Sequence, residues 1–213
     1  NRRVLMDIGV AGPVAGYIVS IIVILIGLSL SKLDPLPVTF PAGQGIQMEG
    51  NSLTYLLLKY ITFGQILPQP PTYGELSPLL YWVRYFFTGR PFPFGGLDVM
   101  IHPVAWAGWA GLLVTSLNLI PAGQLDGGHI FQLLFGKKWS RRILPVILVA
   151  LAALGFVWSG WWLWAGLVFF FGRIYAEPLD QITPLDPFRK ALGVLALVIF
   201  ILTFIPVPLM IIS

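Results

Sequence analysis

The chain has 213 residues, of which 57% are hydrophobic and 10% are charged, and its formal net charge is +4. A soluble domain would carry about 25% charged residues, so we expect a multi-pass membrane protein in the lipid bilayer, with the positive charge at an anionic membrane face and no nucleic-acid partner. With no cysteine and only two histidines, disulfides, thiolate metal sites and an all-histidine metal site are excluded.

The first predicted span runs from Val10 to Leu30, a stretch without charge that is long enough to cross the hydrocarbon core. It begins with the small residues of Ala11–Gly16, which favour close packing against a neighbouring helix. Because the chain opens with Asn1-Arg2-Arg3 and not with methionine, we expect a segment of a longer protein.

Residues 32–101 form a long loop that we expect on the non-cytoplasmic side. It is rich in Gly and Pro and contains two amphipathic pieces, Leu53–Leu67 and Leu76–Phe87, which predict interfacial or re-entrant helices. The simplest interpretation of its acidic residues Glu49, Glu75 and Asp98 is that they are exposed to solvent.

The second predicted span runs from Pro103 towards Gly136 and contains a polar motif at residues 118–128. A carboxylate such as Asp126 is costly inside an apolar segment of membrane length, so we interpret it as functional. Alternatively, Asp126 caps a helix while Gly127 and Gly128 form a turn at the membrane surface. Apolar sequence resumes beyond the turn, which favours the first reading, and the two glycines are then expected to break the helix.

Two further residues of this motif have polar or backbone roles. Asn118 offers an amide that can stabilise an oxyanion, orient a peptide, or simply link helices by a hydrogen bond. Pro121 removes a backbone donor and is expected to bend the helix. Non-helical backbone at membrane depth is tolerated where it is buried in protein or lines a water-filled cavity. An extended peptide can form backbone hydrogen bonds with it there.

The apolar run from Ile143 to Phe171 predicts either one long helix or a hairpin with its tip at Ser159-Gly160. Tryptophans around this point favour the hairpin, and so does the distribution of positive charge. With the hairpin and a final span from Ala191 to about Met210, five spans place most Lys and Arg on one side. We therefore predict an all-α helical bundle, one membrane domain over residues 1–213, with Asp126 nearer the cytoplasmic or stromal side.

The remaining polar residues have simpler interpretations. His102 is expected to be a loop or interfacial residue, and His129 a structural residue near the turn. The acidic residues after the hairpin are expected to form weak ion pairs with basic neighbours. These residues are Glu177, Asp180 and Asp186, with Arg173, Arg189 and Lys190 as their candidate partners.

A carboxylate at this depth suits metal binding, proton relay or coordination of a transported ion. Transporters often contain two related halves with matching interrupted segments. This chain has one such segment, so an ion-coupled transporter is the weaker alternative.

The order Asn-x-x-Pro followed by Leu-Asp-Gly-Gly, at Asn118, Pro121 and 125–128, resembles the signature of the site-2 protease family of intramembrane zinc metalloproteases. The likeness extends over residues 7–13, 183–187 and 205–208, and it points to a member of a bacterial plasma membrane or a plastid membrane. It implies zinc-dependent cleavage of the transmembrane segments of membrane-protein substrates. It also implies that Asp126 is a zinc ligand, that Asn118 assists catalysis, and that Pro121, Gly127 and Gly128 shape the site.

The chain departs from the family in one respect, because it contains no His-Glu-x-x-His sequence. The resemblance implies that this sequence supplies the other zinc ligands and the general base. We expect these ligands outside the chain, which would then be inactive alone. The alternative is a catalytically inactive homologue that acts as a membrane binding partner.

Overall fold

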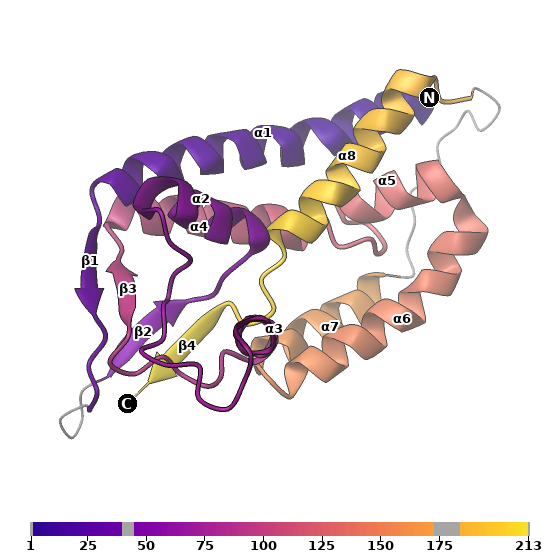
Figure 1. Ribbon diagram of the computed structural model, residues 1–213. Helices are drawn as coiled ribbons and strands as arrows, with labels where there is room; N and C mark the ends of the chain where they lie inside the picture. Colours follow the sequence, from indigo (N-terminus) through magenta and orange to yellow (C-terminus); the bar gives the residue numbers. More distant parts are fainter. Residues whose placement is uncertain (1, 40–44, 173–183, 213) are drawn as a thin grey trace. The chain divides into compact units, whose positions relative to one another are not determined.

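The computed structural model describes residues 2–39, 45–172 and 184–212, and these ranges hold eight helices and four short strands (Figure 1). The helices are α1 (Arg2–Ser29), α2 (Leu53–Phe63), α3 (Pro78–Thr88), α4 (Pro103–Asn118), α5 (Asp126–Phe135), α6 (Lys137–Gly155), α7 (Gly160–Phe171) and α8 (Pro187–Thr203). The strands are β1 (Lys32–Pro35), β2 (Ile46–Glu49), β3 (Leu97–Met100) and β4 (Leu209–Ile212).

The chain forms two compact units. Unit 1 comprises residues 1–18 and 114–202, and unit 2 comprises residues 19–113 and 203–213. The boundary runs through the interiors of α1 and α4 and not through a linker. The organisation as a single membrane domain therefore stays a prediction.

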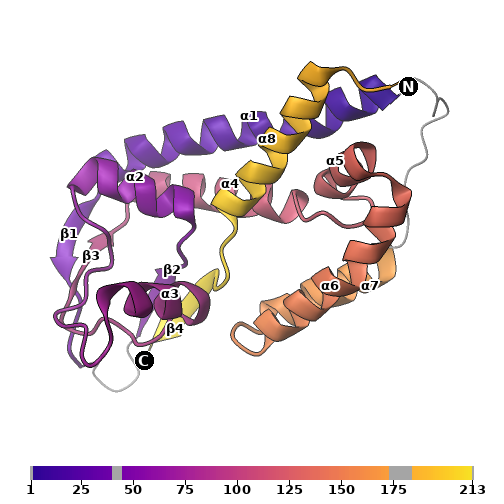
Figure 2. The same cartoon turned by 45° about the vertical axis from the view of Figure 1, so that its right-hand side comes forward.

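Unit 1 is built around an apolar core shared by α1, α5 and α8. Met6 and Val10 of α1 pack with Ile130 of α5 and Ala196 of α8, and all four side chains are buried. In the same unit α6 and α7 lie side by side in Figure 1 and Figure 2, so the predicted hairpin is confirmed. Gly155 permits the tight approach at its tip, because an added Cβ would lie 2.6 Å from the Trp162 ring.

Ion pairs join the start of α8 to α1 within unit 1. Arg189 donates from Nε and Nη2 to the two carboxylate oxygens of Asp7, at 2.8 and 2.7 Å, and from Nη1 to Asp186 at 2.6 Å. The predicted pairing of Asp186 with Arg189 is thus confirmed, and the Asp7 pairing is additional. A hydrogen bond from the Arg189 backbone N–H at 3.0 Å, together with the one from its side chain, lowers the pKa of Asp186. Glu177, Asp180 and Arg173, which were also expected to pair, lie outside the described residues.

Unit 2 contains the predicted long loop, and both expected helices form there as α2 and α3. Serine side chains cap them, with Ser52 accepting from the Tyr55 backbone N–H and Ser77 from that of Leu80. The described residues are mostly helical, as predicted, but this unit is not all-α, because β1 pairs with β3 and β2 with β4, both antiparallel. The second pairing brings Glu49 opposite Leu209, near the other end of the chain.

Two acidic residues of this unit contradict their predicted solvation. Glu49 is 7% exposed and Asp98 is 4% exposed, and both lie near the equally buried Lys59. Glu75 is exposed, as predicted.

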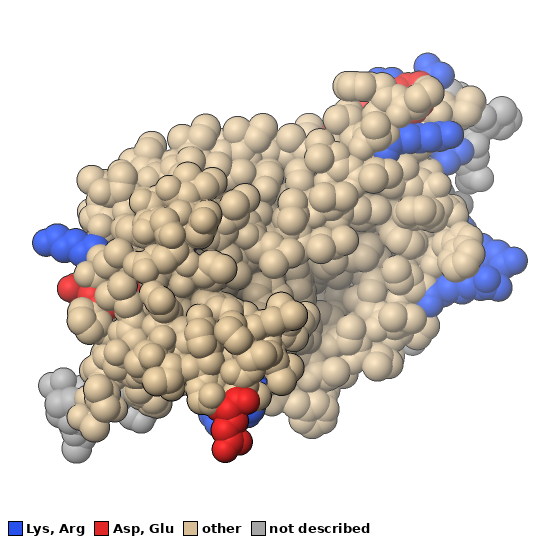
Figure 3. Space-filling view, in the orientation of Figure 1, with Lys and Arg blue, Asp and Glu red and all other residues tan. Residues whose placement is uncertain are grey.

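Five membrane spans are not confirmed. Among the described helices, α1 alone is long and apolar enough to cross a membrane by itself. Helices α4, α7 and α8 have 16, 12 and 17 residues, and α6 begins with charged residues. The visible Lys and Arg side chains of unit 1 gather near the start of α6 and near the starts of α1 and α8 (Figure 3).

Candidate functional site

The polar motif forms the connection between α4 and α5 in unit 1. Helix α4 ends at Asn118, and α5 begins at Asp126, after seven residues that are not helical. Pro121 explains why the helix stops before it, since proline has no N–H and disfavours the helical conformation in the preceding residue. The break therefore lies before Asp126, and the expectation that Gly127 and Gly128 break the helix is wrong.

The two glycines instead allow the start of α5 to lie directly against the motif loop, residues 119–125. A Cβ at Gly127 would lie 2.8 Å from the carbonyl oxygen of Ile120 and closer still to the Leu119 carbonyl group. A Cβ at Gly128 would lie 2.6 Å from the carbonyl carbon of Ala122. These neighbours are backbone atoms, which cannot rotate away. The loop consequently folds back so that the end of α4 and the start of α5 adjoin.

Gly123 fixes the other side of the motif loop against α7. Its φ of +56° lies in the left-handed region that side chains disfavour. A Cβ there would also overlap the Phe171 carbonyl oxygen and lie 3.0 Å from the carbonyl carbon of Gly172. The motif loop is thus held between α5 and the end of α7 by close backbone contacts.

Asp126 is half-buried and faces the small-residue segment of α1. Its Oδ2 lies 4.0 Å from the position that a Cβ on Gly12 would occupy. The glycines on either side along that face, Gly9 and Gly16, lie against Ile130 and Thr115 in the same way, at 3.6 and 3.0 Å. The expected close packing of this segment is confirmed, and its partners are α5, including Asp126, and the end of α4. The three- and four-residue spacing of these glycines was the signal for this face in the sequence.

Asp126 and Asn118 stand at the two helix ends that the motif loop separates. As the first residue of α5, Asp126 lies at the positive end of the helix dipole, which offsets part of the cost of burying its carboxylate. Asn118, at the end of α4, is exposed, so its amide is accessible to a bound molecule. The motif thus brings together a carboxylate that faces α1 and an accessible amide.

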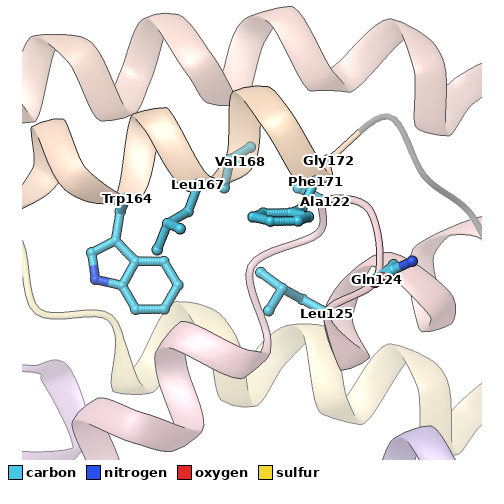
Figure 4. Close-up of a pocket in the computed structure, with 8 residues that line it drawn as sticks. All are labelled: Ala122, Gln124, Leu125, Trp164, Leu167, Val168, Phe171 and Gly172. Atoms are coloured by element: carbon cyan, nitrogen blue, oxygen red, sulfur yellow. The ribbon is translucent and has the colours of Figure 1, made fainter.

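An apolar pocket of about 300 Å³ lies beside the motif loop (Figure 4). Leu125 lines it from the loop, and Trp164, Leu167 and Phe171 line it from α7. Asp126 is not among its lining residues, although it follows Leu125 directly. The pocket is therefore a neighbour of the carboxylate and does not contain it.

The described residues do not complete a zinc site. They contain no group of three or more His, Asp or Glu side chains that could hold a metal ion, whereas catalytic zinc normally takes three protein ligands and water. His129 lies one turn after Asp126 on α5. His102 lies in the loop directly before α4, as expected, and its Nδ1 accepts a hydrogen bond from the Val104 N–H at 3.2 Å. Asp126 can thus supply one ligand of a larger set.

Comparison with known proteins gives a consistent family assignment. The model of peptidase family M50 matches residues 1–158. The probable zinc metalloprotease EGY2, chloroplastic, of Arabidopsis thaliana is 29% identical over 210 residues, which cover 98% of this chain and 32% of that relative. The corresponding EGY1 protein of the same plant is 30% identical, over 97% of this chain and 33% of its own length.

A rice relative, the probable zinc metalloprotease EGY3, chloroplastic, of Oryza sativa subsp. indica, is 40% identical over 117 residues, covering 52% of this chain and 20% of its own length. No solved structure matches the chain. The chain spans about a third of the length of the EGY2 and EGY1 relatives. The matched family model, which covers well over half of the residues, shows that the chain belongs to peptidase family M50, the family of the site-2 proteases.

Proposed function

We propose that this chain forms part of an intramembrane zinc metalloprotease that cleaves transmembrane segments of membrane proteins. The observation that carries the proposal is the placement of Asp126. It stands at the start of α5, directly after the non-helical motif loop, and its carboxylate faces Gly12 of α1. Family membership and the names of the relatives support the protease class and zinc as its metal.

In this proposal Asp126 is one zinc ligand, and the other protein ligands come from outside this chain. Asn118, exposed at the end of α4, binds the substrate peptide or its transition state. Gly127 and Gly128 hold the start of α5 against the motif loop and so fix the position of the carboxylate. Pro121 contributes by ending α4 ahead of the site.

The proposed substrate is an unwound transmembrane helix. A peptide bond inside a helix is shielded by the helix's own side chains and hydrogen bonds, so cleavage needs an extended stretch. The non-helical backbone of residues 119–125 is where an extended peptide can form new backbone hydrogen bonds. The names of the relatives place them in chloroplasts, which supports a plastid membrane as the location. The proposed orientation, with Asp126 towards the stromal side, rests on the distribution of Lys and Arg along the sequence.

The test uses the full-length protein purified in detergent, with zinc content and cleavage of a transmembrane reporter measured on the same samples. Asp126→Asn should abolish cleavage and lower the bound zinc. Asp34→Asn, which changes an exposed carboxylate of β1, is the matched control and should alter neither. Retention of both zinc and cleavage by the Asp126 variant would contradict the proposal. A wild-type protein that neither binds zinc nor cleaves would favour the inactive homologue.

A further inference from the structure

Unit 2 contains a cluster of titratable side chains that the proposed protease site does not use. We call it the Glu49 cluster. It comprises Glu49 at the end of β2, Tyr55 and Lys59 on α2, Tyr85 on α3 and Asp98 on β3. All five are at most 7% exposed. A buried charge is costly without a partner, so the contacts within the cluster indicate which of its charges are compensated.

Lys59 and Asp98 form the closest pair of opposite charges in this cluster. Burial raises the pKa of Asp98, and Lys59 and the Val99 N–H oppose this rise. The Lys59 Nζ lies 4.0 Å from Asp98 Oδ1 and 4.7 Å from the centre of the Tyr55 ring, a cation–π contact. Asp98 Oδ1 also accepts a hydrogen bond from the Val99 backbone N–H at 2.8 Å. One ammonium is thereby matched by one carboxylate.

Glu49 is then the second carboxylate beside a single cation. Its Oε1 accepts a hydrogen bond from the Tyr55 hydroxyl at 2.8 Å. If Glu49 is ionised, the buried cluster carries one uncompensated negative charge, which the Asp98 carboxylate makes less favourable. Burial, opposed by Lys59 and assisted by Asp98, raises the pKa of Glu49 from 4.5 to about 7. Burial and the same two carboxylates also raise the pKa of Tyr85, so this residue stays neutral.

The backbone next to Glu49 joins three segments of unit 2. Glu49 pairs with Leu209 of β4, and the next residue, Gly50, donates its N–H to the Pro208 carbonyl oxygen at 2.7 Å. The Gly50 carbonyl oxygen accepts from Trp109 Nε1 of α4 at 2.8 Å. A change of charge on Glu49 therefore acts where β2, the segment before β4, and α4 meet.

We propose that the Glu49 cluster is a pH-sensitive clamp in unit 2, which tightens when Glu49 takes up a proton and loosens when Glu49 releases it. The facing groups are Tyr55 and Lys59 from α2, Tyr85 from α3 and Asp98 from β3, and Glu49 is the member whose charge has no counterpart. The clamp is independent of the proposed protease function. It responds to the compartment that surrounds residues 32–101.

The direction of the effect follows from proton linkage. Because the pKa of Glu49 is higher in the folded state than its ordinary 4.5, the folded state binds more protons between pH 4.5 and about 7. The clamp is therefore most stable at low pH. Its free energy of opening falls as the pH rises through this window and is constant above it. From pH 5 to pH 8 the opening equilibrium should rise by roughly 70-fold for complete exposure of Glu49.

Hydrogen exchange measured by mass spectrometry on the full-length protein in detergent tests this. Protection of peptides covering β2 and α2, corrected for intrinsic exchange rates, should fall from pH 5 to pH 8. Glu49→Gln keeps the acceptor for Tyr55 but removes the group with the pKa near 7, so the fall in its protection between pH 5 and pH 8 should be much smaller than in wild type. Glu75→Gln, at an exposed glutamate of the same unit, should behave as wild type. Wild-type protection that does not change with pH, or Glu49→Gln protection that falls as steeply as that of wild type, would overturn the proposal.

A second measurement needs no variant and covers the case in which Glu49→Gln fails to fold. Infrared difference spectra of the wild-type protein should contain the band of a protonated, buried carboxyl group that disappears with a midpoint near pH 7. The absence of any carboxyl band that titrates between pH 6 and 8 would contradict the clamp.

Discussion

Substitution of Gly127 by alanine tests the close contact between α5 and the motif loop. In an open helical site, alanine in place of glycine stabilises by up to about 1 kcal/mol. At Gly127 the new Cβ would collide with the carbonyl groups of Leu119 and Ile120, and such overpacking typically costs about 1–3 kcal/mol. We therefore expect Gly127→Ala to lower the free energy of unfolding by about 1 kcal/mol or more.

Gly166 in α7 is the matched control, because a Cβ there meets no atom within 4 Å. Gly166→Ala should leave stability unchanged or raise it by up to about 1 kcal/mol. The free energies of unfolding of the two variants should then differ by about 1–2 kcal/mol, which for a domain of about 200 residues corresponds to roughly 2–8 °C in melting temperature. Circular dichroism melting of the full-length protein in detergent measures this difference.

Activity should respond more strongly than stability at this position. Relief of the collision requires the motif loop or the start of α5 to move, and this movement displaces the Asp126 carboxylate. A displacement of about 1 Å at a reacting centre can cost roughly 100-fold in rate. A Gly127→Ala protein that melts at or above the wild-type temperature would refute the close contact, as would equal losses in both glycine variants.

Three further outcomes are expected. Asn118→Ala should lower turnover while zinc content is retained, and a parallel loss of zinc would count against a role in substrate or transition-state binding. Arg189→Ala should lower the melting temperature more than Lys190→Ala, a substitution of the exposed neighbouring residue. High salt should reduce the difference in melting temperature between the two variants, because it screens the ion pairs. Equal melting temperatures at low salt would show that the ion pairs are not stabilising. Because the natural chain lacks cysteine, Lys138→Cys and Thr72→Cys, both at exposed positions, can be labelled singly with a membrane-impermeant thiol reagent. Labelling of both from the same side would contradict the predicted topology.

Local sequence predicted where most of the helices lie. The apolar run with a tryptophan-rich centre predicted the hairpin of α6 and α7, because tryptophan and glycine at its tip disfavour one continuous helix. The polar motif stood out because a carboxylate and an amide interrupt a long apolar stretch. The position of the helix break was predicted too late in the chain, because glycine seemed the natural breaker, whereas Pro121 ends the helix first.

The fold of residues 32–101 depends on partners that are distant in sequence. The strands have only four residues each, and β1 contains Lys32, Asp34 and Pro35, which give no strand pattern. Glu49 and Asp98 look solvated in isolation, and only the fold brings them near Lys59. The one local hint was Lys59 itself, a lone charge four residues after Tyr55 in an otherwise apolar helix.

The pairing of β2 with β4 has a consequence for biosynthesis. Ile46 faces Ile212, so the segments from α2 to α8 are all translated between one strand and its partner. Until the ribosome has released β4, β2 has an open edge, and the Gly50 N–H has no Pro208 to which it can donate. Unit 2 therefore completes its assembly only after β4 has been translated, and in that interval its unpaired strand is a natural target for membrane chaperones.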